Sequence, residues 1–320
     1  MAAALLCASH SPLMYCCARE PEQFDAIERV FAERAEAVKQ FDPEVVFVFG
    51  PDHFNGFFMK LMPSFCIGSA CRSVNDIGGF EGVFDVPEQL AHDAIRFVRE
   101  QGVDVAASYE MIADHGFSQT MVRTLGGLDT FPVVPVFIST VVEPYVPFAR
   151  SRALGDAIGK FAASLGKRVL FLGSGGMSHN PLRYYPKFGT GESRVTEYQL
   201  HGGTSPDGLT SDEWLERLVT MHEEGAHMLI DGRRTKADIK LNPTVDKEFL
   251  QVLVEGRLAD VDAWSPVEKV EQGGIGFLEL HTWLAAAAAA RAAGGSSPVV
   301  DIYAETMEYG IALGIVHSDP

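Results

Sequence analysis

The sequence predicts an α/β fold in which a central sheet, mostly parallel or mixed, is covered by helices. Short apolar runs typical of buried strands alternate along the chain with longer segments whose apolar residues recur at helical spacing. The chain has 320 residues, of which 47% are hydrophobic and 22% charged, so it can bury a substantial core. Because no sharp change of composition divides the chain, we expect a single domain over residues 1–320.

Each expected element has a local reason. Strands are predicted where short apolar runs end at glycine, proline or polar residues, at "ALLCAS", "PEVVFVFG", "VDVAASY", "FPVVPVFIS" and "KRVLFLGSGG". Helical periodicity and capping signals predict helices at residues 21–40, 87–101, 148–165, 212–232 and 277–292. From residue 184 the chain becomes polar and rich in glycine, serine and threonine, which is typical of a linker or a loop that covers a substrate.

Charge and composition exclude several classes of partner. The formal net charge of -17 and the pI near 5.0 argue against binding to nucleic acid or to an anionic membrane, because both require a positive field. The stretch "LAAAAAARAAGG" is interrupted by Arg291 and is far shorter than the roughly 20 apolar residues of a membrane span. The five cysteines form no regular framework, so we expect reduced thiols in a cytoplasmic protein.

Four histidines follow predicted strands. His10 lies in "CASHSP", His53 in "GPDHFNGF" and His179 in "GSGGMSHNP", while His115 in "ADHGFSQ" follows its strand at a greater distance. Open α/β sheets bind ligands at the carboxyl ends of their strands, where loops converge on a rigid platform. Each histidine alone is typical of a turn or cap, but together the four predict one shared pocket at that edge.

The other histidines occur in contexts typical of helices, polar loops or the terminus, and we expect them to be solvated: His92, His201, His222, His227, His281 and His317. The stretch "HEEGAH" resembles a zinc-protease helix, but its histidines are five residues apart. Residues at that spacing do not share a helix face, so the stretch does not predict a zinc site.

Imidazole and carboxylate ligands suit Fe(II), which two histidines and one carboxylate can bind while leaving positions open. Glu279 is a candidate for the carboxylate, because it lies among apolar residues in "GGIGFLELHTWLAAAAAA" and an unpaired buried carboxylate is costly. An acid in a first helical turn that complements the helix dipole explains Glu279 equally well. The stretch "GSGGMS" lacks both phosphate-loop patterns, so phosphate binding is the weaker interpretation.

Several motifs together resemble the type III extradiol ring-cleavage dioxygenases: "SHSP", "PDHFNGFF", "DHGFSQ", "LGGLD", "PVVPVFI" and "KRVLFLGSGGMSHNP". They occur in the family's order and cover nearly the whole chain, although the resemblance fades between about residues 185 and 245. The resemblance implies one extradiol dioxygenase catalytic domain with Fe(II) bound by His10, His53 and Glu279. It further implies that His115 is a proton donor and His179 a proton acceptor.

The resemblance also implies the reaction. Fe(II) and O2 would cleave a catechol ring beside its two hydroxyl carbons, giving a 2-hydroxy-6-oxo dienoate. We expect the substrate to be a 2,3-dihydroxyphenyl carboxylate such as 3-(2,3-dihydroxyphenyl)propionate or 2,3-dihydroxycinnamate, and the protein to be a homo-oligomer. The candidates for binding the carboxylate are Arg150, Arg152, Lys187 and Arg194. The alternative function is that of a non-catalytic metal-binding or protein-interaction member of the same superfamily.

Overall fold

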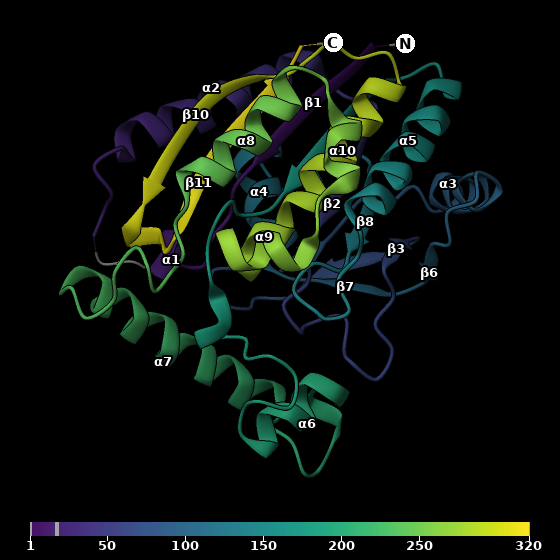
Figure 1. The fold of residues 1–320 in the computed structure, drawn as a ribbon. Coiled ribbons are helices and arrows are strands. Elements are labelled where there is room, and N and C mark those ends of the chain that lie inside the picture. Colours follow the sequence, from purple (N-terminus) through teal and green to yellow (C-terminus); the bar gives the residue numbers. More distant parts are fainter. Residues whose placement is uncertain (1, 17–18, 320) are drawn as a thin grey trace.

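The computed structural model describes residues 2–16 and 19–319, so Cys17 lies outside the described residues. The largest feature in this part of the chain is an eight-stranded sheet (Figure 1). In spatial order its strands are β10 (Val299–Thr306), β11 (Ile311–Ser318), β1 (Ala2–Ala8), β9 (Arg168–Ser174), β2 (Val45–Gly50), β8 (Val133–Ile138), β3 (Phe65–Gly68) and β6 (Ala106–Ser108).

The centre of this sheet is parallel. β1, β9, β2 and β8 run side by side in the same direction, with Ala8 opposite Ser174 and Phe49 opposite Gly173. β11 and β3 pair antiparallel with the two ends of this block, so the sheet is mixed, as the sequence predicted. The carboxyl ends of the four central strands therefore lie at one edge.

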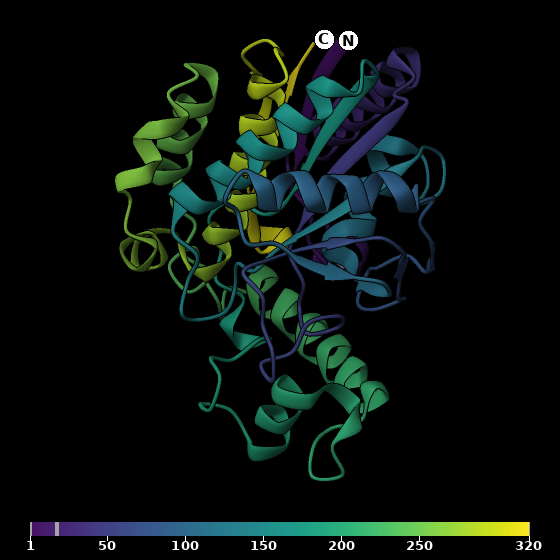
Figure 2. The same ribbon diagram turned by 90° about the vertical axis from the view of Figure 1, so that its right-hand side faces the viewer.

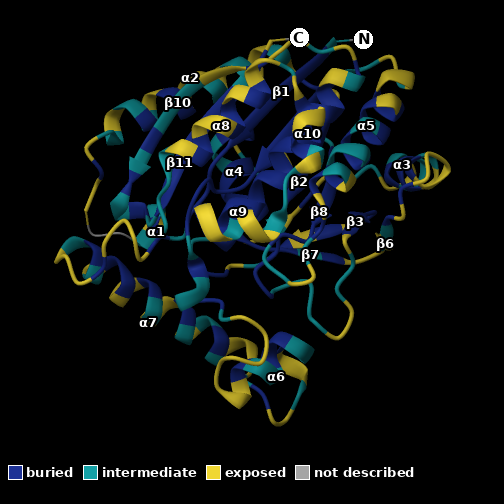
Figure 3. Cartoon of the chain, viewed as in Figure 1, coloured by how far each residue is buried: buried dark blue, intermediate teal, exposed yellow. Residues whose placement is uncertain are grey.

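Helices cover both faces of the sheet, as Figures 1 and 3 show. Side chains alternate along a strand, so Phe47 faces one helical layer and Val48 the other. One layer contains α3 (Glu88–Glu100), α5 (Phe148–Ser164), α8 (Pro243–Val254) and α10 (Leu280–Ala292), with α9 (Pro266–Gly273) beside it. The other contains α2 (Phe24–Phe41) and α4 (His115–Leu125). The α/β prediction is confirmed.

The alanine run of the sequence packs α10 closely against α5. A Cβ atom added at Gly155 would lie 2.1 Å from the carbonyl oxygen of Ala285, and one added at Gly159 would lie 2.2 Å from that of Ala289. Two glycines four residues apart on α5 and a row of alanines on α10 therefore let the two backbones approach each other. This interface holds α10, and with it the residue that precedes the helix, Glu279, against the sheet.

A smaller sheet lies beside the carboxyl edge. Its strands are β5 (Gly82–Val83), β4 (Cys71–Ser73) and β7 (Met111–Ala113), and β4 runs parallel to β7. The predicted strand "VDVAASY" contains only the short β6, and His115 follows β7 instead. Strands of two to four residues are too short to show a period in the sequence.

The polar segment after residue 184 extends beyond the carboxyl edge. It contains α6 (Ser193–His201) and α7 (Ser211–Ile230), which Figure 2 shows below the body of the molecule, and α7 contacts α1 (Leu13–Cys16). Short 3-10 turns occur at Pro181–Arg183, Gly202–Thr204, Leu258–Ala263, Ile275–Glu279 and Met307–Tyr309. The strands at "ALLCAS", "PEVVFVFG", "FPVVPVFIS" and "KRVLFLGSGG" and all five predicted helices are confirmed, whereas the hairpin of β10 and β11 was not predicted. Among the described residues, no helix is long and apolar enough to cross a membrane.

Candidate active site

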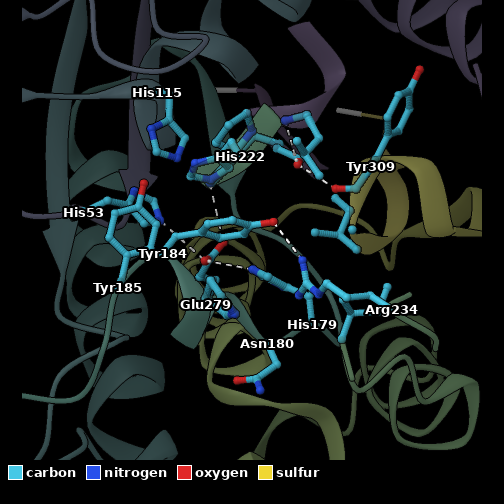
Figure 4. A pocket seen from close by; sticks show the side chains of 18 residues that line it. His53, His115, His179, Asn180, Tyr184, Tyr185, His222, Arg234, Glu279 and Tyr309 are labelled. Carbon is cyan, nitrogen blue, oxygen red and sulfur yellow. Dashed lines mark hydrogen bonds and ion pairs between the residues drawn. The ribbon is translucent and has the colours of Figure 1, made fainter. Parts of the chain in front are cut away.

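Three of the predicted histidines come from neighbouring parallel strands. His10 follows β1, His179 follows β9 and His53 follows β2, and these strands are adjacent in the order β1, β9, β2. All three residues are buried, with exposures of 4%, 9% and 3% respectively. The sheet thus brings together imidazoles that are up to 169 positions apart in the chain. Figure 4 shows the cavity that they line.

Glu279 joins this group from the turn before α10. It ends the 3-10 turn that precedes α10, and it is only 1% exposed. Its Oε2 lies 3.5 Å from Nε2 of His10, while its Oε1 lies 3.6 Å from Nε2 of His53 and 3.5 Å from Nε2 of His179. Within the described part of the chain, no lysine or arginine forms an ion pair with this carboxylate. Glu279 therefore faces imidazoles and not solvent.

His115 joins the group from the smaller sheet. It is the first residue of α4 and follows Asp114, whose side chain caps that helix by accepting the backbone N–H of Gly116. Its ring stacks on that of His53 with centroids 4.2 Å apart, and it lies 5.5 Å from the ring of His10. The structure therefore brings all five predicted site residues together.

Each of the four histidines has a hydrogen-bond partner at Nδ1. The Nδ1 atoms of His10, His53 and His115 lie 3.0 Å from Oγ of Ser174, 3.3 Å from Oδ2 of Asp114 and 2.5 Å from Oδ2 of Asp76, respectively. His179 Nδ1 lies 2.7 Å from the carbonyl oxygen of Met177. Hydrogen bonds of this kind fix the orientation of imidazoles and leave Nε2 available for a ligand.

The charges of the site favour a bound cation. Burial lowers the pKa of His10 to about 3, because an imidazolium loses its hydration there. Burial acts to raise the pKa of Glu279, but the surrounding imidazoles, His179 foremost, outweigh it and hold that pKa well below its ordinary value. At His53 the carboxylates of Asp114 and Glu279 outweigh burial and raise the pKa well above its ordinary value. The same carboxylates would stabilise a metal ion at that imidazole.

The pair of His115 and Asp76 holds a proton. Burial, followed by the nearby His53, lowers the pKa of His115 to about 3. Burial and the neighbouring Asp114 raise the pKa of Asp76 well above its ordinary value. Asp76 and Nδ1 of His115 therefore share one proton across their short hydrogen bond.

Glycines make room for the site. A Cβ atom at Gly176 or at Gly276 would lie 2.5 Å or 2.1 Å from Cε1 of His179, and one at Gly175 would lie 2.9 Å from Cβ of Glu279. The backbone N–H of Gly176 also donates to Oε2 of Glu279 at 2.7 Å. The glycines of "GSGGMS" thus serve the close approach of the two side chains, which explains this stretch without a phosphate.

His10, His53 and Glu279 are spaced so that they could bind one metal ion. The separations of 3.5 and 3.6 Å between Glu279 oxygens and the two Nε2 atoms are near the ~3.0 to 3.4 Å between ligands of an ion bound at ~2.1 Å. Two imidazoles and one carboxylate are the ligand set of non-haem Fe(II) sites. Ring nitrogens of His10, His53 and His115 also lie within 4.8 Å of one another, so geometry alone admits His115 as the third ligand.

The cavity is also lined by residues that the sequence analysis did not identify. The cavity is lined by the five predicted site residues and also by residues of the polar segment that begins at residue 184: Tyr184, Tyr185, His222, Arg234 and Ile239. The polar segment therefore covers the site. The buried hydroxyl of Tyr185 has no hydrogen-bond partner among the described residues, and its ring lies 5.3 Å from that of His53.

Two histidines were wrongly expected to be solvated. His222 and His281 are 2% and 1% exposed. His222 stacks on Tyr184 at 3.7 Å, whereas His281 stacks on Phe148 in the core and does not line the cavity. The four-residue spacing of Trp214, Leu218 and His222 on α7 is a signal that would have placed His222 on the buried face. None of the predicted carboxylate-binding candidates, Arg150, Arg152, Lys187 and Arg194, lines this cavity.

Comparisons with known proteins identify the family of the chain. Residues 4–311 match the family model described as the catalytic LigB subunit of aromatic ring-opening dioxygenase. A Rhodococcus protein named 2,3-dihydroxyphenylpropionate/2,3-dihydroxicinnamic acid 1,2-dioxygenase is 41% identical over 315 residues, which cover 98% of each chain. A protein of the same name from Mycolicibacterium gilvum is 43% identical over 291 residues, 91% of this chain and 90% of the relative.

A solved structure shows the same fold. The crystal structure of an uncharacterized protein from Escherichia coli K12 aligns with a TM-score of 0.51 at 13% identity, over 98% of both chains. At that identity the likeness concerns the fold alone. The family match and the relatives together establish that the chain belongs to the catalytic LigB subunits of aromatic ring-opening dioxygenases, the type III extradiol dioxygenase family.

Proposed function

We propose that this chain is an Fe(II)-dependent extradiol dioxygenase that acts on a catechol with a carboxylated side chain. The preferred substrate would be 3-(2,3-dihydroxyphenyl)propionate or 2,3-dihydroxycinnamate, and the whole chain would form one catalytic domain. The observation on which this rests is the convergence of His10, His53 and Glu279 with two further histidines in one buried cavity. The names of relatives about 40% identical over nearly the full length support the substrate class.

His10, His53 and Glu279 are the residues that would hold the iron. When bound, Fe(II) would supply open positions for the two oxygens of the catechol and for O2. The protein would contribute a face of three ligands, each held by a hydrogen bond. Nδ1 of His10 pairs with Oγ of Ser174, Nδ1 of His53 pairs with the carboxylate of Asp114, and Glu279 accepts the backbone N–H of Gly176. Hydrogen bonds to the ligands keep these side chains in the orientation that binds a metal.

His179 is suited to the role of base. Because a carbonyl oxygen can only accept a hydrogen bond, Nδ1 of His179 must carry the proton that it donates to Met177. Nε2 is the other ring nitrogen, and it lies 3.5 Å from Oε1 of Glu279 at the cavity. His179 would accept the proton of a catechol hydroxyl at this atom.

His115 is suited to the role of acid. Its Nδ1 faces Asp76, and this pair holds the proton that the ring can pass on. His115 would donate a proton from its other ring nitrogen as the aromatic ring opens, while Asp76 holds the ring in place through Nδ1. Both atoms of O2 would enter the product, which leaves as a yellow 2-hydroxy-6-oxo dienoate.

The test uses the purified full chain, freed of metal and then loaded anaerobically with Fe(II). Adding 3-(2,3-dihydroxyphenyl)propionate under air should consume O2 and produce a yellow dienoate, which should contain two 18O atoms when 18O2 is supplied. Fe(II) should restore this activity better than Zn(II) or Mg(II). A protein that binds metal in this cavity but cleaves no catechol would be a non-catalytic member of the family, and the proposed function would be wrong.

The substrate class has a separate test. We expect kcat/KM to be higher for the propionate and the cinnamate than for protocatechuate or unsubstituted catechol at the same ionic strength. Equal turnover of unsubstituted catechol would contradict the substrate assignment while leaving the ring-cleavage reaction intact. Light scattering during size-exclusion chromatography would test the expected homo-oligomer.

A further inference from the structure

The cavity contains a buried cation that plays no part in the mechanism above. Arg234 is the sole lysine or arginine among the described residues that line the cavity, and it is only 8% exposed. It lies in the turn after α7, where its backbone N–H donates to the carbonyl oxygen of Met228 at 2.8 Å. This bond holds the backbone at Arg234 to the end of α7 in the segment that covers the site.

Arg234 has no carboxylate partner among residues 2–16 and 19–319. Its neighbour Arg233 pairs with Asp231 at 2.7 Å, and Lys236 pairs with Glu305 at 2.8 Å. The carboxylate of Asp238 is engaged elsewhere, because its Oδ2 accepts the backbone N–H and the hydroxyl of Thr235, both at 2.8 Å.

A guanidinium keeps its charge in proteins, so Arg234 places a positive charge without an ion-pair partner in a buried cavity. Burying such a charge without a partner costs free energy, and an anionic ligand would recover that cost. An unpaired arginine in a chain with a net charge of -17 is therefore a candidate site for an anion.

Tyr184 adds a second donor beside the guanidinium. Nη1 of Arg234 donates to Oη of Tyr184 at 3.0 Å, which Figure 4 shows at the wall of the cavity. Burial raises the pKa of Tyr184, so its hydroxyl keeps a proton that it can donate in turn. The stacking of Tyr184 on His222, at 3.7 Å, fixes the plane of the ring. The remaining N–H groups of Arg234 and the hydroxyl of Tyr184 together match the acceptors of one carboxylate.

We propose that Arg234, with the hydroxyl of Tyr184, binds the side-chain carboxylate of the catechol substrate and sets the preference for carboxylated catechols. This inference rests on the proposed function and adds the residue that recognises the tail of the substrate. Long-range attraction cannot supply that recognition, because the net charge of -17 repels an anion. A short-range contact inside the cavity can.

The test compares Arg234→Gln with wild type on two catechols, 3-(2,3-dihydroxyphenyl)propionate and its uncharged methyl ester. We expect the ratio of kcat/KM for the acid to that for the ester to fall about 10- to 100-fold, which is the worth of a hydrogen bond to a charged group. The loss should reside in KM for the acid, because the contact lies away from the reacting atoms. Arg234→Lys should retain part of the preference, since it keeps the charge but loses the paired donors.

Arg233→Gln is the matched control, because Arg233 is adjacent in sequence but exposed and already paired with Asp231. Its acid-to-ester ratio should equal that of wild type. If Arg234→Gln leaves the ratio unchanged, or reduces turnover of acid and ester equally, Arg234 does not bind the carboxylate and the inference is wrong.

A second measurement separates this inference from the proposed function. The metal-free protein can be titrated calorimetrically with 3-phenylpropionate, which lacks the catechol hydroxyls and is therefore not cleaved, and with its neutral amide. Wild type and Arg233→Gln should bind the acid more tightly than the amide, and Arg234→Gln should bind both alike. If wild type cleaves no catechol but shows this preference, the proposed function fails and the carboxylate site stands. If wild type cleaves catechols without this preference, the site fails alone.

Discussion

Nδ1 of His115 lies 2.5 Å from Oδ2 of Asp76, although the two residues are 39 positions apart. They meet because β4 and β7 are parallel, so the segments that follow these strands emerge at the same edge of the smaller sheet. The other Asp76 oxygen accepts the backbone N–H of His115 at 3.0 Å. Asp76 therefore holds both the backbone and the ring of the proposed acid.

We predict that Asp76→Asn lowers kcat about 10- to 100-fold, the usual effect of losing the carboxyl group that orients a functional imidazole. The amide oxygen can still accept the backbone N–H of His115, so the fold should persist. The bound metal, measured by elemental analysis, should stay at the wild-type level because Asp76 supports no proposed ligand. Loss of metal from this variant would show that His115 is a ligand or that the site collapses.

Asp114 supports a different residue, so its variant should show a different defect. Its Oδ2 accepts the backbone N–H of His53 at 2.6 Å and lies 3.3 Å from Nδ1 of the same residue. We predict that Asp114→Asn weakens metal affinity about 10- to 100-fold, because His53 is a proposed ligand. Competition with a chelator measures that affinity directly. If the variant keeps its metal affinity but loses turnover, Asp114 supports the proposed acid His115 and not the metal ligand His53.

The ligand assignment predicts two classes among the five site residues. His10→Ala, His53→Ala and Glu279→Gln should lose most of the bound metal. His115→Ala and His179→Ala should keep it and lose about 10²- to 10⁴-fold in turnover, the usual contribution of an acid or base. Elemental analysis after anaerobic loading separates the classes. Metal lost from His115→Ala and retained by Glu279→Gln would favour the three-histidine arrangement that geometry also allows.

The sequence predicted those parts of the site that a parallel sheet positions. His10, His53 and His179 follow apolar runs that end at a helix-stopping residue, and the carboxyl ends of parallel strands meet at one edge. Glu279 could be nominated because a carboxylate among apolar residues needs a partner. That it faces His10 and not solvent depends on how α10 packs, which no local pattern contains.

The residues that cover the site were not predictable in the same way. Arg234 lies in a turn whose sequence is typical of solvated loops, and its burial depends on where α7 places that turn. His222 was missed because "HEEGAH" is polar, although one face of α7 is buried. The hairpin of β10 and β11 was missed partly because Val299 and Val300 are exposed at the edge of the sheet, so no buried face organises its start.

Close packing of α10 against α5 predicts a stability defect. A side chain at Gly155 would collide with the backbone of α10, since its Cβ would lie 2.1 Å from the carbonyl oxygen of Ala285. We expect Gly155→Val to lower the free energy of unfolding by about 3 kcal/mol, the upper range for overpacking. Urea unfolding measures this, and Ala163→Val at an exposed position of α5 is the control. Equal effects of the two variants would mean that the helices separate at little cost.

Gly276 should be needed for the position of His179 and not for the fold. Its Cβ would lie 2.1 Å from Cε1 and 2.3 Å from Nε2 of that ring, so Gly276→Ala must displace the proposed base. A displacement of about 1 Å can cost about 100-fold in rate, so we expect kcat to fall by that order. The metal should remain, because the three atoms nearest that Cβ all belong to His179 and none to a proposed ligand.

The control for Gly276 is Gly127→Ala, whose Cβ would meet the hydroxyl of Thr130, a group that can rotate away. It should keep wild-type turnover and metal. Adding free imidazole or another small base to Gly276→Ala should restore part of the rate if the defect is a displaced base, since a diffusible base can replace it. Full activity in Gly276→Ala would show that His179 can move without loss, and the proposed role of His179 as a fixed base would then be wrong.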